Sequence, residues 1–409
     1  MIPNDYCTPL VRGFNTPYVR PGRRDGSSMN ILMIVANPYS HDPRVKSEAE
    51  ALVKAGHTVH VLGWDRHGTF PRSEEINGVL VHRIGRTLGM KIMPLDILRM
   101  RFWWKEAVRR EAPFIDKIDV IHCHDLDTLP IGIRLKKLRK IPLIYDAHEI
   151  WGYMVSFDIP WWKRYINLEK RLVKEADIMI TVDEPLQEYF AEFFGRADED
   201  AKLSSKPIYI IKNCKEFNEV AYQPPTEKIF TMVYAGTLGA SREILELMDA
   251  VRETDNIKFI IAGSGNKKYV RKVKKHCSQN NNVKYLGRIS QEEVIALTKR
   301  CHVGVCLLGK GTLSNKMALP NKVFEAMVSG RPLITTKGLY YSDFAREKGF
   351  GIPVGSVDEC IEAIKILMAD PKKYEQYGVK ALEAALEYNW ANEKEKLVEI
   401  YRSLGKKPL

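Results

Sequence analysis

Short hydrophobic runs recur along the chain, and a helical pattern follows most of them. The first run, ILMIVA at residues 31–36, is apolar at every position, which is typical of a parallel strand buried on both faces. A helical pattern over residues 44–55 follows it and ends at Gly56, a usual C-terminal position for glycine. A second strand, TVHVL, spans residues 58–62. Together these segments predict a βαβ unit with a right-handed crossover.

The same alternation continues through two stretches of the chain. In the first stretch we predict further strands at 120–123, 143–146, 178–182 and 208–211, with helices at 129–139, 165–175 and 185–194. In the second stretch we predict strands at 231–234, 258–262, 284–286, 303–307 and 333–335. This order predicts an α/β fold of two tandem, doubly wound, Rossmann-like domains. Their ligand would bind at the carboxyl ends of the strands, in a cleft between the domains.

The pattern divides the chain into four segments. Residues 1–28 lack apolar periodicity, and we expect a disordered arm there. Residues 29–215 and 216–390 should form the two domains, because the prolines and polar residues of 215–228 suit a linker. The final segment, 391–409, carries an amphipathic helix that either crosses back to brace the first domain or caps the second.

Composition is that of a globular protein, with 45% hydrophobic and 28% charged residues. No apolar run approaches the roughly 20 residues that a membrane span requires. The net charge of +12 either attracts the phosphates of nucleotides, nucleic acid or anionic lipids, or reflects a generally basic surface. The sequence has no aromatic RNA-recognition signature, so we expect no nucleic-acid partner.

The seven cysteines are scattered and form no CxxC pair, which predicts reduced thiols and a cytoplasmic protein. His122, Cys123 and His124 are adjacent, but neighbours on a strand point to opposite faces. We therefore expect no metal site from this triplet alone.

The strongest chemical signal is LPNKVFEAMVSGRP at residues 319–332. Pro320 suits the start of a helix, where free N–H groups and a partial positive charge face outward. Lys322 adds a full charge, and together these features suit a diphosphate. Glu325 lies about one turn further on the same face, where a carboxylate could accept both hydroxyls of a ribose. The alternative is an ordinary amphipathic helix with an exposed Lys–Glu pair.

Polar residues also follow the strands of the first predicted domain, where a ligand site is expected. Asp42 either caps the first helix, with Pro43 at its first position, or enters the cleft. Arg44 could there meet an anionic phosphate. Other polar residues placed after strands in this way are His124, Asp125, His148 and Glu149.

The pattern P-N-K-x-x-E-x-x-x-x-G-x-P from Pro320 resembles the donor-binding motif of GT-B glycosyltransferases, in particular family 4, the group 1 glycosyltransferases. Other segments match the family in kind and order, including NILMIVAN at 30–37, YAGTL at 234–238 and YLGRIS at 285–290. The resemblance spans nearly the whole chain, from residue 29 to residue 404.

The resemblance implies that Glu325 holds the ribose and that Lys322 and Arg242 face the diphosphate. It also implies that the backbone near Arg288 and Ile289 contacts the base. The implied donor-binding set is Gly236, Thr237, Arg242, Arg288, Ile289, Pro320, Asn321, Lys322 and Glu325. A plainer alternative is that the glycines serve only turns and that Arg242 is a surface charge.

In the first domain the resemblance places a histidine or an acid beside the anomeric carbon. The candidate catalytic residues are His124, Asp125 and Asp42, and the candidate acceptor-binding residues are Arg44, His148 and Glu149. Family 4 members retain anomeric configuration, whereas an inverting relative would need a general base near the acceptor hydroxyl. Several of these acids and histidines could be that base, so the stereochemistry stays open.

Two features of the sequence bear on the donor, and the first of them departs from the family pattern. Many family members carry two glutamates with seven residues between them, and the first would fall at Met317, which leaves the donor sugar open. Asp125 and Asp127 form a D-x-D, a motif that binds a metal in the other large transferase fold, GT-A. Acids are also favoured at a helix N-terminus by capping and the helix dipole. A phosphate site on the second domain makes a metal redundant, so we expect no metal and no cofactor.

Residues 90–110 and 151–171 mix tryptophan with basic side chains. Such segments suit a membrane interface, and peripheral contact with an anionic cytoplasmic face would fit a lipid-linked acceptor. The alternative is core aromatics with solvated charges beside them. The sequence thus predicts transfer of a hexose from a UDP- or GDP-sugar to a glycan, lipid-linked or other acceptor. The other readings are a nucleotide-sugar epimerase of the same fold and a basic protein that binds membranes or nucleic acid.

Overall fold

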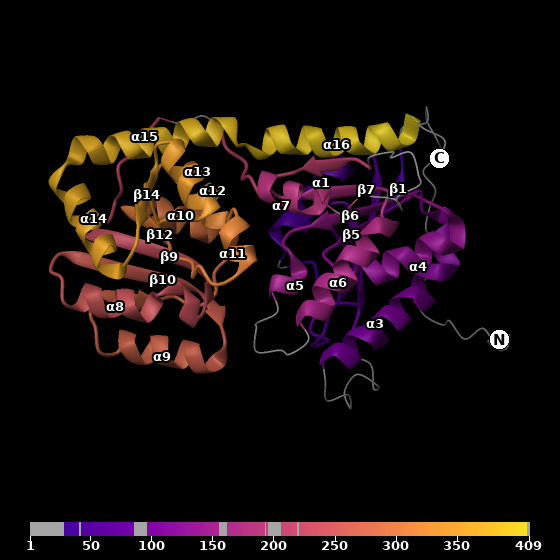
Figure 1. Cartoon of the computed structure of the whole chain (residues 1–409), viewed down its shortest axis with the longest axis horizontal. Helices are drawn as coiled ribbons and strands as arrows, with labels where there is room; N and C mark the ends of the chain where they lie inside the picture. Colours follow the sequence, from indigo (N-terminus) through magenta and orange to yellow (C-terminus); the bar gives the residue numbers. More distant parts are fainter. Residues whose placement is uncertain are drawn as a thin grey trace.

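The computed structural model describes residues 28–40, 42–85, 96–154, 162–192, 194, 206–218 and 221–406. The predicted N-terminal arm lies outside these residues, apart from Ser28. The described chain forms two α/β domains side by side, each built around a mainly parallel sheet (Figure 1). The predicted α/β class with two Rossmann-like domains is confirmed.

The N-terminal sheet has eight strands in the order β3-β4-β2-β1-β5-β6-β7-β8. Its strands are β1 (Asn30–Val35), β2 (Thr58–Trp64), β3 (Ser73–Ile76), β4 (Val79–Ile84), β5 (Val120–His124), β6 (Leu143–Ala147), β7 (Ile178–Thr181) and β8 (Ile208–Ile210). Its helices are α1 (Pro43–Lys54), α3 (Asp96–Glu111), α4 (Leu129–Arg139), α5 (Trp151–Met154), α6 (Trp162–Leu172) and α7 (Glu184–Ala191). Only β3 pairs antiparallel with its neighbour, as the outer strand of a hairpin that the sequence pattern did not predict.

The C-terminal sheet has six parallel strands in the order β11-β10-β9-β12-β13-β14. Its strands are β9 (Phe230–Leu238), β10 (Ile257–Gly265), β11 (Val283–Tyr285), β12 (Val303–Cys306), β13 (Leu333–Thr336) and β14 (Gly351–Val354). Its helices are α8 (Ile244–Arg252), α9 (Lys267–Cys277), α10 (Gln291–Arg300), α11 (Leu313–Met317), α12 (Asn321–Ser329), α13 (Tyr340–Glu347), α14 (Val357–Ala369) and α15 (Pro371–Glu387).

The apolar run of β1 explains why this strand lies at the centre of its sheet. All six of its residues are buried, and successive side chains point to opposite faces. Ile31 and Met33 join a core that includes residues of α1 and of the last helix, α16 (Trp390–Lys406). Leu32 and Ile34 join a second core with residues of α3 and α4. A strand covered on both faces is typically apolar along its length, as residues 31–35 of β1 are.

The chain passes between the domains twice, once before β9 and once between α15 and α16. Helix α15 packs against α12 of the C-terminal domain, whereas α16 lies along α1 of the N-terminal domain (Figure 1). Side chains also join the domains, because the Tyr340 hydroxyl of α13 donates to Glu184 Oε2 of α7 at 2.8 Å. These contacts link the N-terminal and C-terminal domains.

Candidate active site

Helix α12 carries the motif that the sequence analysis singled out. Pro320 is its N-cap, with an extended backbone, and Asn321 is its first residue. Its buried face includes Val323 and Phe324, which pack into the core. Gly330 ends the helix in the left-handed conformation, at a φ of 61°. The local pattern therefore places Lys322 and Glu325 in the first and second turns, as predicted.

Lys322 extends from α12 toward the end of β9. Its Nζ lies 4.6 Å from the centroid of the Tyr234 ring. A Cβ atom at Gly236 would lie 2.5 Å from this Nζ, and Gly236 has a φ of 151°, which side chains rarely adopt. Glycine at this position therefore leaves the space that the ammonium fills. The backbones of β9 and the neighbouring strand β10 are also in close contact here. A Cβ atom at Gly263 of β10 would lie 1.8 Å from the Gly236 carbonyl oxygen.

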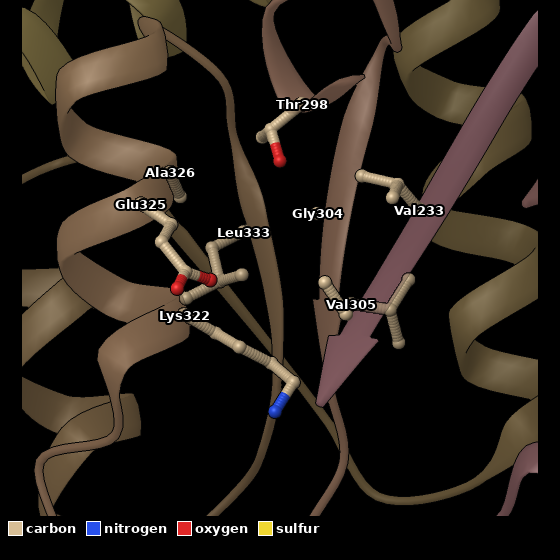
Figure 2. Close-up of a pocket in the computed structure, with 9 residues that line it drawn as sticks. Val233, Thr298, Gly304, Val305, Lys322, Glu325, Ala326 and Leu333 are labelled. Atoms are coloured by element: carbon tan, nitrogen blue, oxygen red, sulfur yellow. The ribbon is translucent and has the colours of Figure 1, made fainter. Parts of the chain in front are cut away.

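Glu325 lies one turn from Lys322, but within the described part of the chain the two side chains form no ion pair. Figure 2 shows both leaving α12 on the same side, with the Lys322 ammonium extended away from the Glu325 carboxylate. They border a small pocket of about 10 Å³, room for about one water molecule. The lining residues are Val233, Ala235, Thr298, Gly304, Val305, Lys322, Glu325, Ala326 and Leu333. Burial raises the pKa of Glu325, and the ammonium groups of Lys215 and Lys322 oppose that rise.

The remaining predicted donor residues border the same end of the C-terminal sheet. Thr237 is in β9, where its carbonyl accepts a 2.5 Å hydrogen bond from the Tyr234 hydroxyl. Arg242 ends a short 3-10 helix, Ala240–Arg242, directly before Glu243 in the left-handed conformation at a φ of 52°. Arg288 and Ile289 follow β11 and precede α10. The structure thus gathers the predicted set at one edge, and their roles stay predictions.

In the N-terminal domain, Arg44 of α1 is held inside the fold. Its Nη2 lies 2.9 Å from Asp146 Oδ1 and its Nε 3.1 Å from Asp146 Oδ2, a two-point ion pair with β6. Its Nη1 donates to the Ile211 carbonyl at 2.7 Å. The side chain is only 8% exposed. Arg44 was predicted to contact the acceptor. In the structure its guanidinium is instead bound to Asp146, and it holds that buried carboxylate in place.

His148 is held between two carboxylates. Its Nε2 lies 3.1 Å from Asp146 Oδ2, and its Nδ1 lies 3.3 Å from Asp125 Oδ2. Burial opposes its charge, but the carboxylates of Asp125 and Asp146 raise the pKa of His148 to about 10. His148 is therefore an imidazolium at neutral pH.

The backbone of Asp125 is strained in a way that serves this pairing. Its φ of 62° is left-handed, which is uncommon for a residue with a side chain. In this conformation its N–H donates to the Asp146 carbonyl at 2.9 Å, and its carboxylate accepts the N–H of His148 at 3.0 Å. Asp125 thus orients His148, which the sequence assigned only to acceptor binding.

His124 lies deeper than the sequence analysis expected. It is 1% exposed, and its Nδ1 lies 3.3 Å from Asp146 Oδ2. Its ring stacks on His122 at a centroid distance of 4.3 Å, because residues two apart on a strand share a face. His122 Nδ1 in turn lies 2.8 Å from the Tyr401 hydroxyl of α16. Of the two predicted histidines, His148, with a side chain 17% exposed, is the one that reaches the surface of the site.

A group of buried side chains could in principle hold a metal ion: Glu48, His122, His124 and Asp146, whose ligand atoms lie within 4.8 Å of one another. The sequence analysis named neither Glu48 nor Asp146 as a candidate. Arg44 already contacts both acids, with its Nε 3.1 Å from Glu48 Oε1. A divalent ion would add charge beside this guanidinium and the imidazolium of His148, so the donor set fits a metal poorly.

Asp42 and Glu149 have different surroundings. The Asp42 carboxylate accepts from the Val45 N–H at 3.2 Å and from the Asn37 side chain at 2.8 Å, so it caps α1, one of the two predicted readings.

Glu149 is exposed to solvent. Although the Glu149 side chain reaches the surface, the protein around it displaces part of its water. This desolvation and the Asp125 charge raise the pKa of Glu149 to about 7, while the charges of His148 and of Arg242 in the other domain oppose the rise. The charge of Arg242 therefore acts on Glu149 across the domain boundary.

The tryptophans proposed for a membrane interface are buried in the core or packed against it wherever the structure describes their side chains. Trp103 is fully buried and stacks on Trp64 at 5.1 Å. Trp104 donates to the Asp127 carbonyl at 2.5 Å. The side chains of Trp161 and Trp162 lie outside the described residues. Among the helices that the structure describes, none is both long and apolar enough to cross a membrane.

Comparisons with known proteins agree with the two-domain arrangement. The family model described as Glycosyltransferase Family 4 matches residues 44–208, and that described as Glycosyl transferases group 1 matches residues 216–384. An uncharacterized glycosyltransferase of Methanocaldococcus jannaschii is 25% identical, over 91% of this chain and 98% of the relative. The chitobiosyldiphosphodolichol beta-mannosyltransferase of Kluyveromyces lactis is 23% identical, over 92% of this chain and 90% of the relative.

Two solved structures show the same fold at low identity. The sucrose-phosphate synthase of Thermosynechococcus elongatus superimposes with a TM-score of 0.75 at 18% identity, over 92% of this chain and 99% of that one. The Anabaena protein HepE in complex with UDP-glucose gives a TM-score of 0.67 at 17% identity, over 92% of this chain and all of that one.

Proposed function

Since the chain belongs to the group 1 glycosyltransferases of the GT-B fold, we propose that it transfers a hexose from a UDP- or GDP-sugar. The C-terminal domain would bind the nucleotide diphosphate, and the N-terminal domain would bind the acceptor. The complex of Anabaena HepE with UDP-glucose supports a nucleotide-sugar donor.

The arrangement at the start of α12 carries this proposal. The helix N-terminus, the Lys322 ammonium and the glycine backbone at Gly236 converge at the end of β9. Departure of a nucleotide diphosphate places negative charge on its phosphates, and fixed positive groups stabilise that charge as it develops. Arg242 would add a second cation from the other side of the phosphates.

On the acceptor side, we propose that His148 acts as a fixed cation. Its position between Asp125 and Asp146 keeps it protonated, so it cannot take a proton at neutral pH, and its two ring nitrogens already face these carboxylates. The base that inversion would require would then be another group, and Glu149 would be our candidate for it. We propose retention, in line with family 4, and the configuration of the product distinguishes the two outcomes.

We propose that transfer needs no metal ion. Arg44 already pairs with the two acids of the group that could bind one. Activity should therefore persist in excess EDTA, and a loss that Mg²⁺, Mn²⁺ or Zn²⁺ restores would refute this part of the proposal.

We propose a lipid-linked acceptor at the cytoplasmic face of a membrane. The Kluyveromyces relative is named for a dolichol diphosphate acceptor, and the net charge of +12 would favour peripheral contact with anionic lipid. Because Trp103 is buried in the core, basic side chains rather than this tryptophan would make that contact.

The first test is a thermal-shift panel of UDP, GDP, ADP and CMP, with Glu325→Ala as the matched control. A nucleotide at 100 times its Kd stabilises the folded protein by about 2.7 kcal/mol. We expect UDP or GDP to raise the melting temperature in the native chain and less so in the variant. No shift with any nucleotide would refute the donor site. Product analysis with donor alone then separates a transferase from an epimerase, which would alter the sugar without an acceptor.

A further inference from the structure

Lys215 lies where the two crossings between the domains meet. It follows β8 and precedes the second domain, and its backbone pairs with Asn389, just ahead of α16. The Trp390 N–H donates to the Lys215 carbonyl at 3.1 Å, and the Asn389 side chain donates to the Phe217 carbonyl at 2.7 Å. This short pairing fixes the backbone of Lys215 against the beginning of the last helix.

The side chain of Lys215 reaches the donor helix. Its Nζ donates to Asn321 Oδ1 at 2.8 Å, at the first residue of α12 and 106 positions along the chain. Burial lowers the pKa of Lys215, and the Glu325 carboxylate opposes that change. A cation from outside the motif thus binds the first residue of the motif's helix, and its charge acts on Glu325 in the pocket.

The two lysines near α12 have different partners. Lys322 lies over the Tyr234 ring and against Gly236, on the side where we place the phosphates. Lys215 is bound to Asn321, and the charges of both lysines act on Glu325. The charge of Glu325 also acts on the buried thiol of Cys306 in β12. We therefore assign stabilisation of the Glu325 carboxylate to Lys215, and binding of the phosphates to Lys322.

We propose that Lys215 is a positioning residue of the donor site, which holds Asn321 at the start of α12 and keeps Glu325 ionised for the ribose of the nucleotide. The proposal rests on the proposed donor site. An ionised carboxylate can accept hydrogen bonds from both ribose hydroxyls, whereas a protonated one has lost an acceptor. A buried carboxyl without a nearby cation takes up a proton more readily, so removing Lys215 would cost affinity first at low pH.

The experiment measures UDP and GDP binding by isothermal titration calorimetry, from about pH 5.5 to about pH 8.5. The chains compared are the native protein, Lys215→Met, Lys215→Arg and Glu325→Gln. Lys372→Met, at an exposed position of α15, is the matched control for loss of a lysine. We expect Lys215→Met to weaken binding about tenfold or more near neutral pH, as for loss of a charged hydrogen-bond partner.

The pH profile separates positioning from a merely structural role. In Lys215→Met the loss of affinity on acidification should begin at a higher pH than in the native chain, because the Glu325 pKa rises. Lys215→Arg should keep the native profile, and Glu325→Gln should flatten it. A Lys215→Met chain that binds more weakly with an unshifted profile overturns the proposal, as does one that binds like Lys372→Met.

Failure of the donor site itself gives a different result. If the native chain binds neither nucleotide, the proposed function fails and the role of Lys215 fails with it. If the native chain binds and Glu325→Gln weakens binding while Lys215→Met does not, the donor site stands and only the role of Lys215 is overturned.

Discussion

Replacing Gly236 with alanine should displace Lys322 and weaken nucleotide binding. The new Cβ would lie 2.5 Å from Lys322 Nζ, and an ordinary contact needs about 3.5 Å, so the ammonium must move by about 1 Å. The φ of 151° at this residue adds backbone strain. The displaced atom ends a flexible side chain, so the backbone strain should dominate, and we expect a loss of folding stability of about 1–3 kcal/mol.

The cost should appear mainly in affinity. A hydrogen bond to a charged group contributes about 1.5–3 kcal/mol, which corresponds to roughly 10- to 150-fold in Kd. Calorimetric titration with the nucleotide that binds measures this loss, and thermal melting measures stability. Gly239→Ala is the matched control, because a Cβ there meets nothing within 4 Å and the backbone is extended.

A double-mutant cycle tests whether the alanine acts through Lys322. If it does, Gly236→Ala combined with Lys322→Met should bind no more weakly than Lys322→Met alone. Additive losses would show that the backbone at Gly236 acts independently of Lys322. Native affinity in Gly236→Ala would refute the placement of the diphosphate beside this glycine.

Three further predictions concern the buried network of the N-terminal domain. Arg44→Met leaves the Asp146 carboxylate buried without its arginine and should lower the unfolding free energy by about 3–5 kcal/mol, measured by urea denaturation; an unchanged midpoint would contradict this. Tyr401→Phe removes the hydrogen bond to His122 and should cost about 1 kcal/mol in the same assay, with no loss arguing against the contact. His148 has a pKa raised from 6.5 to about 10 in the folded chain, so its stabilisation is complete below about pH 6.5 and is lost as pH rises toward 10. The stability difference between the native chain and His148→Gln should therefore shrink between neutral and alkaline pH, and a constant difference would show that His148 is not charged.

Local patterns were enough to predict much of the fold. The run at 31–36 is observed as β1 at Asn30–Val35, because a continuous apolar run is typical of a strand buried on both faces. The start of α12 after Pro320 and its end at Gly330 follow from the backbone preferences of these two residues. The α/β class and the family assignment, which rest on several such segments in order, are confirmed. By contrast, the edge strand β3, with sequence SEEI, has no apolar alternation that would reveal it.

Only the tertiary structure decided which charges meet. Arg44 and Asp146 are 102 residues apart, and Lys215 and Asn321 are 106 apart, so no local spacing indicates either pair. The sequence placed Lys322 and Glu325 on one helix face. In the structure the Lys322 ammonium instead fills the space beside Gly236 of β9, over the Tyr234 ring. Periodicity reports which face of an element is buried, because burial is a local average over one helix or strand. Partners across a sheet or a hinge depend on how elements pack, and that is set by the whole chain at once.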